Sequence, residues 1–333
     1  MSEEEIKQTE LPLNYLGIDP KDLRKIGPPV QPETQGIRID SYLGDNFPFK
    51  SRTGWKTLLE QGHVYVSGRP VKSSYRLRLN DTVSYYYPDY MEPRVSEDIK
   101  IIWEESGVMV TSKPPGLPMH EGGKFRCSTF SKKIATLTDN TYSAVHRLDR
   151  ETSGAVLCGS TPMIRKALSD QLEKKLIHKT YICLCFNTPS QSEWLVDAPI
   201  GDLPGSLVRI RRWINFNGYP SQTRFKLLDT ILDNYSMIQA EPLTGRTNQI
   251  RIHAAYMGLH LIGDKLYNPD ETLFIKHQEG QDVTNIVLHD RVCLHAQKIS
   301  FIHPVLNKRF EIEVPLYDDL SFLWKKLKKD SIS

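Results

Sequence analysis

Beyond residue 98 the apolar residues occur in short segments separated by turns and charged stretches. Five of these segments have strand character: Ile99–Trp103, Val108–Thr111, Ala155–Cys158, Tyr181–Phe186 and Met237–Pro242. Helices are predicted only over Arg165–Lys175, Thr247–Met257 and Leu320–Lys329. Gly258 is expected to end the second of these helices. Because the strands do not alternate with long helices, the pattern predicts an α+β fold with a mixed, mainly antiparallel central sheet rather than a doubly wound one.

The chain divides into segments of different character. Its 333 residues suffice for about two domains. Residues 1–35 contain five prolines and no sustained periodicity, which predicts a loosely packed extension. Residues 36–90 are predicted to form a small α/β module, residues 91–98 a linker, and residues 99–325 a second, larger domain.

Inside the small module, local signals predict one helix and one hairpin. Ser51 can cap a helix that runs to Gln61 and ends at Gly62. A strand over His63–Val66 leads into the turn Ser67–Pro70, and a return strand is predicted between Val71 and Val83.

Composition excludes several classes of protein. No apolar run approaches the roughly 18 residues of a membrane span, and the first residues lack a signal-peptide pattern, so we expect a soluble, cytoplasmic protein with no membrane partner. Five scattered cysteines predict neither a disulfide framework nor a zinc site; Cys183 and Cys185 are expected to be small buried residues of one strand. The net charge of +3 is too small to indicate a polyanionic partner, so evidence for such a partner must come from local clusters of basic residues.

Basic residues do cluster between residues 50 and 78. Seven are found there, against Glu60 as the one acid: Lys50, Arg52, Lys56, Arg69, Lys72, Arg76 and Arg78. Arg52 and Lys56 fall on one face of the predicted helix, where like charges disfavour folding unless an anion lies nearby. The cluster is typical of a nucleic-acid-binding surface, although exposed helices and strands also carry such residues for solubility alone.

A dense polar segment, His146–Gly154, lies between two predicted strands. Loops held in this way often carry binding or catalytic groups. Within it Asp149 has Arg147 and Arg150 as close neighbours, and a carboxylate beside guanidinium groups remains ionised and can act as a nucleophile. The alternative is an aspartate that only caps a turn.

A second polar segment, Leu243–His253, includes the start of a predicted helix. Thr247 is expected to cap this helix, which would place Asn248, Gln249 and Arg251 at its positive end, an arrangement suited to an anion or a carboxylate. An ordinary capped helix with a solvated arginine is the alternative. Tyr181 is either a core aromatic or a platform on which a nucleobase stacks.

The small module resembles the S4-like RNA-binding domain. The resemblance is carried, in order, by Gly36–Leu43, Phe47–Arg52, Gly62–Gly68 and Leu79–Val83. It implies that the helical face and the hairpin lie against structured RNA, with Arg52, Lys56, Arg76 and Arg78 as contacts. Ser67 and Asn80 depart from the commonest residues of that family.

Residues 100 to 315 resemble the RluA family of RNA pseudouridine synthases. The matching motifs are Lys113–Leu117, His146–Asp149 with Thr152–Gly154, Leu243–His253 and Gly263–Tyr267. The resemblance implies that Asp149 is the catalytic aspartate, Tyr181 the active-site tyrosine and Arg251 an arginine paired with the aspartate. It also implies that Arg147 fills the space of an extracted base. Arg246 and Asn248 are assigned to RNA contacts; Asn248 stands where the family usually has histidine.

Pseudouridine formation breaks the bond between uracil N1 and ribose C1′ and rejoins the base through C5, so the resemblance implies no metal and no cofactor. The target uridine must leave its stack. Asp149 would attack C1′ or remove a sugar proton, and the resemblance does not choose between these routes. Ribosomal RNA of the large subunit is the expected substrate, with transfer RNA as the alternative, and no obligate protein partner is expected.

Three other interpretations remain. The first is a noncatalytic RNA-binding or assembly protein on the same scaffold. The second is a metal-dependent hydrolase that uses His146, although no metal-ligand spacing is present. The third is a glycoside hydrolase, which would need a second carboxylate opposite Asp149.

Overall fold

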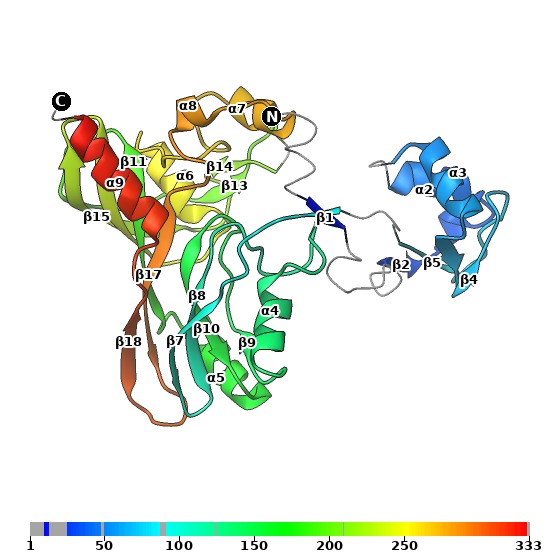
Figure 1. The fold of residues 1–333 in the computed structure, drawn as a ribbon, viewed down its shortest axis with the longest axis horizontal. Coiled ribbons are helices and arrows are strands. Elements are labelled where there is room, and N and C mark those ends of the chain that lie inside the picture. Colours follow the sequence, from blue (N-terminus) through cyan, green and yellow to red (C-terminus); the bar gives the residue numbers. More distant parts are fainter. Residues whose placement is uncertain are drawn as a thin grey trace. The chain divides into compact units, whose positions relative to one another are not determined.

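The computed structural model describes residues 10–12, 25–47, 50–86, 91–123, 125–208 and 210–331. Much of the predicted extension, together with Pro48 and Phe49 of the S4-like motif, lies outside these residues. The chain divides into two compact units (Figure 1). The first comprises residues 1–94 and 122–127, and the second comprises residues 95–121 and 128–333.

Helices and a small sheet form the first unit. The 3-10 helix η3 (Pro32–Thr34) precedes the helices α2 (Ile39–Asn46) and α3 (Arg52–Glu60). Four strands pair in the order β2 (Lys25–Pro29), β5 (Thr82–Tyr85), β3 (Val64–Val66) and β4 (Arg69–Pro70). The core contains Ile39, Leu43, Trp55, Leu58, Val64 and Val83. This is the small α/β module that the sequence predicts.

Local signals predict α3 and the hairpin turn correctly. The Ser51 hydroxyl accepts a hydrogen bond from the Gly54 N–H, and Gly62 has a φ of 77° just after the helix. Ser67 and Gly68 both have positive φ, so they form a two-residue turn that matches the twist of β3 and β4.

Two predictions about this sheet differ from the structure. The predicted return strand between Val71 and Val83 is mostly loop, because the Asp81 carboxylate accepts hydrogen bonds from the Tyr75 hydroxyl and the Arg78 N–H, which fold the chain back. Residues 25–29, predicted as part of the extension, form β2 and pair with β5. Pro28 and Pro29 are tolerated because β2 is an edge strand and its register shifts between Ile26 and Pro29.

A short two-stranded sheet completes the first unit. Strand β6 (Met91–Pro93), within the predicted linker, pairs with β1 (Glu10–Pro12). The buried carboxylate of Glu92 accepts hydrogen bonds from the backbone N–H groups of Arg126 and Cys127. These bonds join residues 122–127 to the unit although they come from a later part of the chain.

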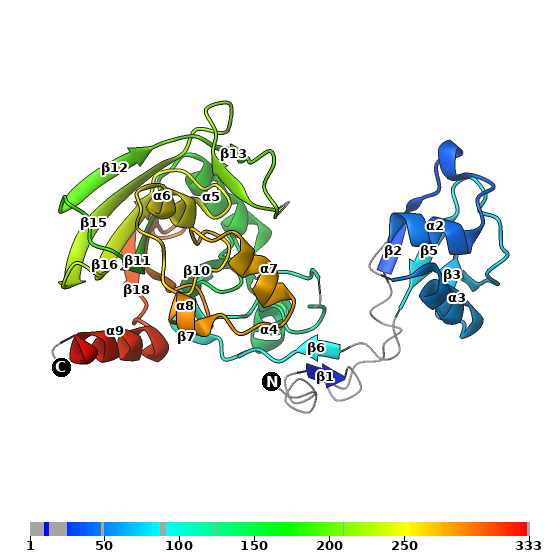
Figure 2. The same cartoon turned by 90° about the horizontal axis from the view of Figure 1, so that it is seen from above.

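The second unit contains a ten-stranded mixed sheet. Its main path runs β12 (Glu193–Asp197), β15 (Gln222–Ile231), β16 (Tyr235–Pro242), β11 (His178–Phe186), β17 (Leu294–Ile302), β10 (Ser153–Gly159), β8 (Val108–Lys113) and β7 (Lys100–Glu105), with β18 (Arg309–Glu313) beside β17 and β9 (Ser143–Ala144) beside β10. Among the described pairs of this sheet, β10 and β17 run parallel and the others antiparallel. The predicted α+β class and mainly antiparallel sheet are confirmed. Figure 2 shows β12, β15 and β16 as long curved strands at one edge.

Helices and one small sheet surround these strands. They are α4 (Phe130–Leu137), α5 (Pro162–Glu173), α6 (Gln249–Tyr256), α7 (Thr272–Gln278), α8 (Thr284–Val287), α9 (Asp318–Asp330), and the pair β13 (Ile200–Asp202) and β14 (Arg212–Ile214). Helices α5, α6 and α9 correspond to the three predicted beyond residue 98, with ends shifted by a few residues. Strands β8 and β10 are buried along their whole length, which explains why Val108–Val110 and Ala155–Cys158 are apolar without alternation.

A glycine allows β10 to lie against β17. Gly154 has a φ of 110°, and a Cβ atom there would lie 2.2 Å from the carbonyl oxygen of Ala296. Cys183 and Cys185 are buried thiols of β11, as predicted. In the described part of the chain, no helix has the length and hydropathy needed to cross a bilayer.

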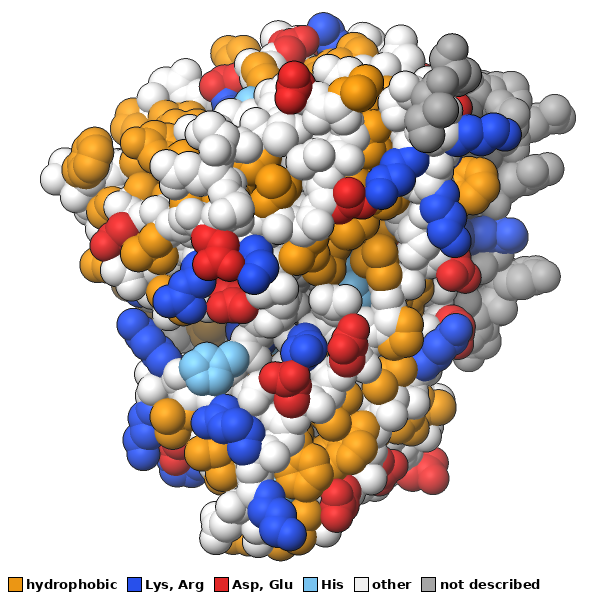
Figure 3. All heavy atoms as spheres, turned by 90° about the vertical axis from the view of Figure 1, so that its left-hand side faces the viewer, with side chains coloured by type: hydrophobic (Ala, Val, Ile, Leu, Met, Phe, Trp, Pro, Cys, Tyr) orange, Lys and Arg blue, Asp and Glu red, His pale blue; other side chains and the backbone are white. Residues whose placement is uncertain are grey.

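Surface charge on one side of the molecule is mixed. On the face at the left-hand side of Figure 1, basic and acidic side chains lie among one another and among hydrophobic ones (Figure 3). Positive charge is therefore not concentrated on this face, in keeping with the small net charge of +3.

Candidate active site

The central strands bring separate polar segments to one cavity. Ala296 of β17 lies opposite Gly154 of β10 on one side and opposite Tyr181 of β11 on the other. The loop that ends at the start of β10 therefore reaches Tyr181. A cavity of about 280 Å³ is lined by residues 146–149, Thr152, Lys179, Tyr181, Pro242, residues 244–251 and Leu294.

All six site residues predicted for the second unit line this cavity: Asp149, Tyr181, Arg251, Arg147, Arg246 and Asn248. The other four predicted RNA contacts, Arg52, Lys56, Arg76 and Arg78, belong to the first unit.

Hydrogen bonds fix the backbone on both sides of Asp149. The Asp149 carbonyl accepts from the Thr152 N–H at 3.1 Å, and the Glu151 carboxylate accepts from the Val292 N–H at 3.0 Å. Lys113 Nζ donates to the Arg150 carbonyl at 3.0 Å and to the carbonyls of Pro114 and Leu117. Burial, together with the nearby Arg291 cation, lowers the pKa of Lys113 to about 7. Lys113 lies in the motif Lys113–Leu117, but the sequence does not predict its hydrogen bond to the Arg150 carbonyl.

His146 ties the start of the loop to β10. Its Nε2 accepts a hydrogen bond from the Leu157 N–H at 3.0 Å, which requires the neutral ring. Burial and the neighbouring Lys179 cation lower the pKa of His146 to about 3. The histidine therefore acts as a neutral structural acceptor, which is not the role of a metal ligand.

This geometry predicts a pH dependence of stability. The pKa of His146 is near 6.5 in the unfolded chain and about 3 in the folded one, so below pH 6.5 the unfolded chain binds the proton and the fold loses stability as pH falls. Between pH 7.5 and pH 5 we expect His146 to contribute a loss of about 2 kcal/mol. Urea denaturation of wild type and His146→Gln at both pH values measures it: the variant, which keeps an acceptor, should lose less stability than wild type by that amount. Equal losses would contradict the assignment.

The start of α6 differs from the prediction. Asn248, rather than Thr247, is the N-cap residue; it has a left-handed φ of 57° and its side chain makes no capping bond. Asparagine tolerates this conformation better than most residues. The Asn248 Oδ1 atom instead accepts from Arg251 Nη1 at 2.8 Å, and its amide donates to the Tyr267 hydroxyl at 3.3 Å.

Arg251 forms a buried, bidentate ion pair with Asp264. Arg251 Nε and Nη2 donate to the two carboxylate oxygens at 2.7 and 2.8 Å, and the Asp264 side chain is 1% exposed. Burial alone would lower the pKa of Arg251, but Asp264 and, to a smaller extent, Asp149 raise it above its ordinary value. The charge of Asp149 therefore acts on Arg251, but the residue that accepts hydrogen bonds from Nε and Nη2 of Arg251 is Asp264. Sequence reasoning missed Asp264, although it lies in the motif Gly263–Tyr267.

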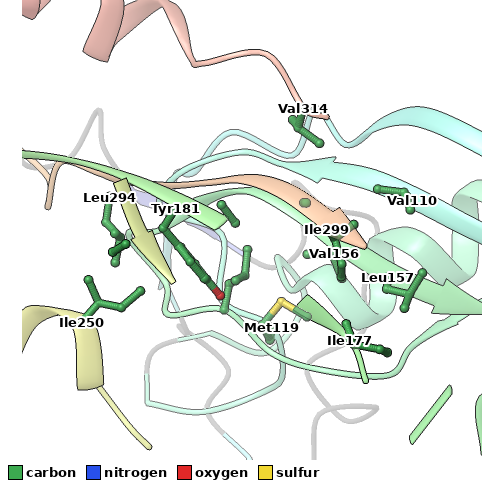
Figure 4. Packing of buried hydrophobic residues seen from close by; sticks show 14 of the residues in the cluster. Val110, Met119, Val156, Leu157, Ile177, Tyr181, Ile250, Leu294, Ile299 and Val314 are labelled. Atoms are coloured by element: carbon green, nitrogen blue, oxygen red, sulfur yellow. The ribbon is translucent and has the colours of Figure 1, made fainter. Parts of the chain in front are cut away.

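Tyr181 is both a core residue and a wall of the cavity. Its side chain extends from β11 with Leu294 and Ile250 on one side and Met119 on the other (Figure 4). Burial raises the pKa of Tyr181, and the Asp149 carboxylate raises it further. At neutral pH the hydroxyl therefore keeps its proton and can donate it in a hydrogen bond.

The charges of the cavity favour an anionic substrate. Among the described lining residues, Asp149 is the one acid, while Arg147, Lys179, Arg246 and Arg251 are basic side chains. Asp264, which does not belong to the lining, offsets the charge of Arg251, and the basic side chains still outnumber the acids. A glycoside hydrolase would need a second carboxylate, which this lining does not supply. Nor do the described residues include a group of three or more His, Cys, Asp or Glu side chains that could hold a metal ion.

Comparison with known proteins agrees with these features. The family described as RNA pseudouridylate synthase matches residues 107–256, and the S4 domain matches residues 37–83. A human structure, RNA pseudouridylate synthase domain containing 4, has the same fold: the TM-score is 0.55 at 20% identity, over 69% of this chain and 93% of that one.

Curated relatives extend the match over most of the chain. An uncharacterized RNA pseudouridine synthase of Chloroflexus aurantiacus is 30% identical, over 90% of this chain and 92% of its own length. Ribosomal large subunit pseudouridine synthase C of Vibrio parahaemolyticus is 28% identical, over 90% and 96%. The mitochondrial tRNA pseudouridine(32) synthase of Saccharomyces cerevisiae is 28% identical, over 70% of this chain and 50% of its own. Together with the cavity around Asp149, these matches show that the chain belongs to the RNA pseudouridine synthases, as an RluA-type member with an N-terminal S4 domain.

Proposed function

We propose that this RNA pseudouridine synthase isomerises uridine in large-subunit ribosomal RNA, with Asp149 as the reacting group. The observation that carries the proposal is the lining of the cavity, in which one carboxylate stands among four basic side chains. A nucleotide brings a phosphate for the cations and a ribose C1′ for the carboxylate. The S4 domain and the name of the Vibrio relative support ribosomal RNA as the substrate class.

Each side chain of the cavity has a proposed task. In one route the Asp149 carboxylate attacks C1′ and uracil leaves with the electrons of its N1 bond; the base turns, and C5 attacks C1′ and displaces the carboxylate. In the other route Asp149 removes a sugar proton as uracil leaves, which forms a glycal, and the proton returns to the sugar when C5 bonds to C1′. In both routes C5 loses its hydrogen as a proton and N1 gains a proton, so that the product is an isomer of uridine. The Arg251 cation, fixed by Asp264, stabilises the Asp149 carboxylate. The protonated Tyr181 packs against the base, and the exposed Arg147 enters the stack in place of the extracted uridine.

The basic face of the first unit is proposed to bind RNA. The Arg52 and Lys56 side chains are 61% and 57% exposed; Arg52 pairs with the buried Asp40 carboxylate and Lys56 with the exposed Glu60. Arg76 donates to the Gly36 carbonyl, while Arg78 is exposed beside it on the loop that Asp81 folds back. Such side chains bind phosphates through charge, largely independently of base sequence.

Replacing Arg78 with glutamine should weaken RNA binding through the loss of one phosphate contact. We expect the slope of log affinity against log salt concentration to become less steep by about 1. Filter binding of ribosomal RNA at four salt concentrations measures the slope. Lys166→Gln, which removes a 76% exposed cation from α5 of the second unit, is the matched control and should leave the slope unchanged. Equal slopes for wild type and Arg78→Gln would exclude Arg78 as a contact.

The proposed substrate is tested by mapping pseudouridine in total RNA from cells with and without the gene. Carbodiimide modifies the pseudouridines, and reverse transcription stops at the modified positions. A stop in large-subunit ribosomal RNA that disappears with the gene supports the proposal and identifies the uridine. A stop lost from transfer RNA instead would replace the proposed substrate by the alternative. An unchanged pattern in every RNA class would favour a noncatalytic RNA-binding protein.

A further inference from the structure

Two large aromatic side chains are exposed on one turn of the second unit. The turn follows β14 and spans residues 215–219; the side chains of Phe216 and Tyr219 are 84% and 62% exposed. Exposed aromatic residues close together on a surface are typical of an interaction site. Neither residue lines the cavity around Asp149.

This turn is held firmly in place. The Tyr219 N–H donates to the Ile200 carbonyl at 2.8 Å, and the Ile200 N–H donates back at 3.0 Å. A Cβ atom at Gly218 would lie 2.4 Å from the same carbonyl oxygen, so glycine is required for this approach. Asn215 adds a hydrogen bond from its side-chain amide to the Asp202 carbonyl at 3.0 Å. The backbone at Tyr219 is therefore fixed before any ligand binds, which lowers the entropy cost of binding.

The turn borders the cavity. Arg246, an exposed residue of the cavity lining, places its guanidinium 5.4 Å from the centre of the Tyr219 ring and donates from Nε to the Pro220 carbonyl at 3.3 Å. Thr244, another lining residue, accepts from the Gln222 N–H at 2.9 Å. Tyr219 thus continues the wall of the cavity outward, next to a cation.

We propose that the Tyr219–Arg246 pair is a stacking platform for the RNA nucleotide that flanks the extracted uridine. The proposal rests on the proposed function, since it concerns the RNA that enters this cavity. An aromatic ring beside a guanidinium suits a single-stranded nucleotide, because the planar groups stack on the base and the cation attracts its phosphate. A protein partner would use the aromatic rings but has no need of a cation at the mouth of the cavity.

Fluorescence quenching tests the platform directly. The probe is a nine-nucleotide oligouridylate with a central 2-aminopurine, titrated with the full chain. Wild type and Tyr219→Phe should quench the probe, whereas Tyr219→Leu should lose most of the quenching and bind about tenfold more weakly. Phe322→Leu, which removes a 71% exposed aromatic from α9, is the matched control and should behave as wild type. Quenching and affinity of Tyr219→Leu equal to wild type, with unchanged thermal unfolding, would overturn the platform.

A second readout separates this proposal from the proposed function. Total RNA labelled with [5-³H]uridine, from cells that lack the gene, releases tritium when C5 forms its new bond. Tyr219→Leu should raise the apparent KM about tenfold and leave kcat within about twofold, because the platform contacts a flanking nucleotide. Wild type that releases no tritium while quenching still depends on Tyr219 would refute the proposed function, and with it the role beside an extracted uridine, although Tyr219 would still be a contact for RNA bases. Tritium release with wild-type KM and quenching in Tyr219→Leu would refute the platform and support the proposed function.

Discussion

Replacing Asp149 with asparagine should lower tritium release from [5-³H]uridine-labelled RNA by at least about a thousandfold, because the amide can neither attack C1′ nor remove a sugar proton. RNA affinity should stay within about twofold of wild type. The loop around residue 149 is held by the Asp149 carbonyl and by Lys113, Glu151 and Val292, and none of these bonds uses the Asp149 side chain. Tritium release and filter binding measure the two quantities.

The neighbouring carboxylate supplies the matched control. Glu151 lies in the same loop, but its carboxylate accepts from the Val292 N–H and pairs with Arg150 outside the cavity lining. Glu151→Gln keeps an acceptor oxygen and should retain activity within about threefold. Turnover near wild type in purified Asp149→Asn would disprove the assignment. Equal loss in both variants, with release of free uracil by wild type, would instead indicate two-carboxylate glycosidase chemistry.

Asp264→Asn is expected to have the second-largest effect, on both stability and rate. The substitution leaves the Arg251 cation buried without its carboxylate, and breaking a buried pair in this way costs about 3 kcal/mol. Asparagine Oδ1 can still accept from the Leu266 and Tyr267 N–H groups, so the loss reports mainly on the ion pair. With Arg251 no longer fixed beside Asp149, kcat should fall by about 10- to 100-fold.

Stability is measured by urea denaturation followed through tryptophan fluorescence in a Trp55→Phe background, which leaves Trp103, Trp194, Trp213 and Trp324 of the second unit as reporters. The double variant Asp264→Asn/Arg251→Met removes both charges and should recover at least half of the lost stability. Its activity should remain low, because no cation is restored next to Asp149. Recovery of activity together with stability would show that the pair serves only the fold.

Periodicity and capping signals are enough to predict many elements without any knowledge of tertiary contacts. Short apolar segments between turns indicated the sheet, and Ser51 with Gly62 indicated both ends of α3, because these signals depend on residues close in sequence. The predictions failed where a distant side chain decides the local conformation. Hydrogen bonds to the Asp81 carboxylate fold the predicted return strand into a loop. At the start of α6, the Asn248 side chain accepts a hydrogen bond from Arg251 and therefore makes no capping bond.

By itself the sequence determined the family resemblance, the class of fold and the cavity residues Asp149, Tyr181 and Arg251, since ordered motifs carry that information. Only the tertiary structure decided which groups pair with them. Arg251 bonds to Asp264, Lys113 bonds to the carbonyl beside Asp149, and Arg246 lies over Tyr219. Salt bridges, hydrogen bonds and stacking act over a few ångströms of space whatever the separation in sequence, so these partners follow from which segments the fold places side by side: β8 pairs with β10 at Lys113 and Gly154, and β15 pairs with β16 at Thr223 and Pro242.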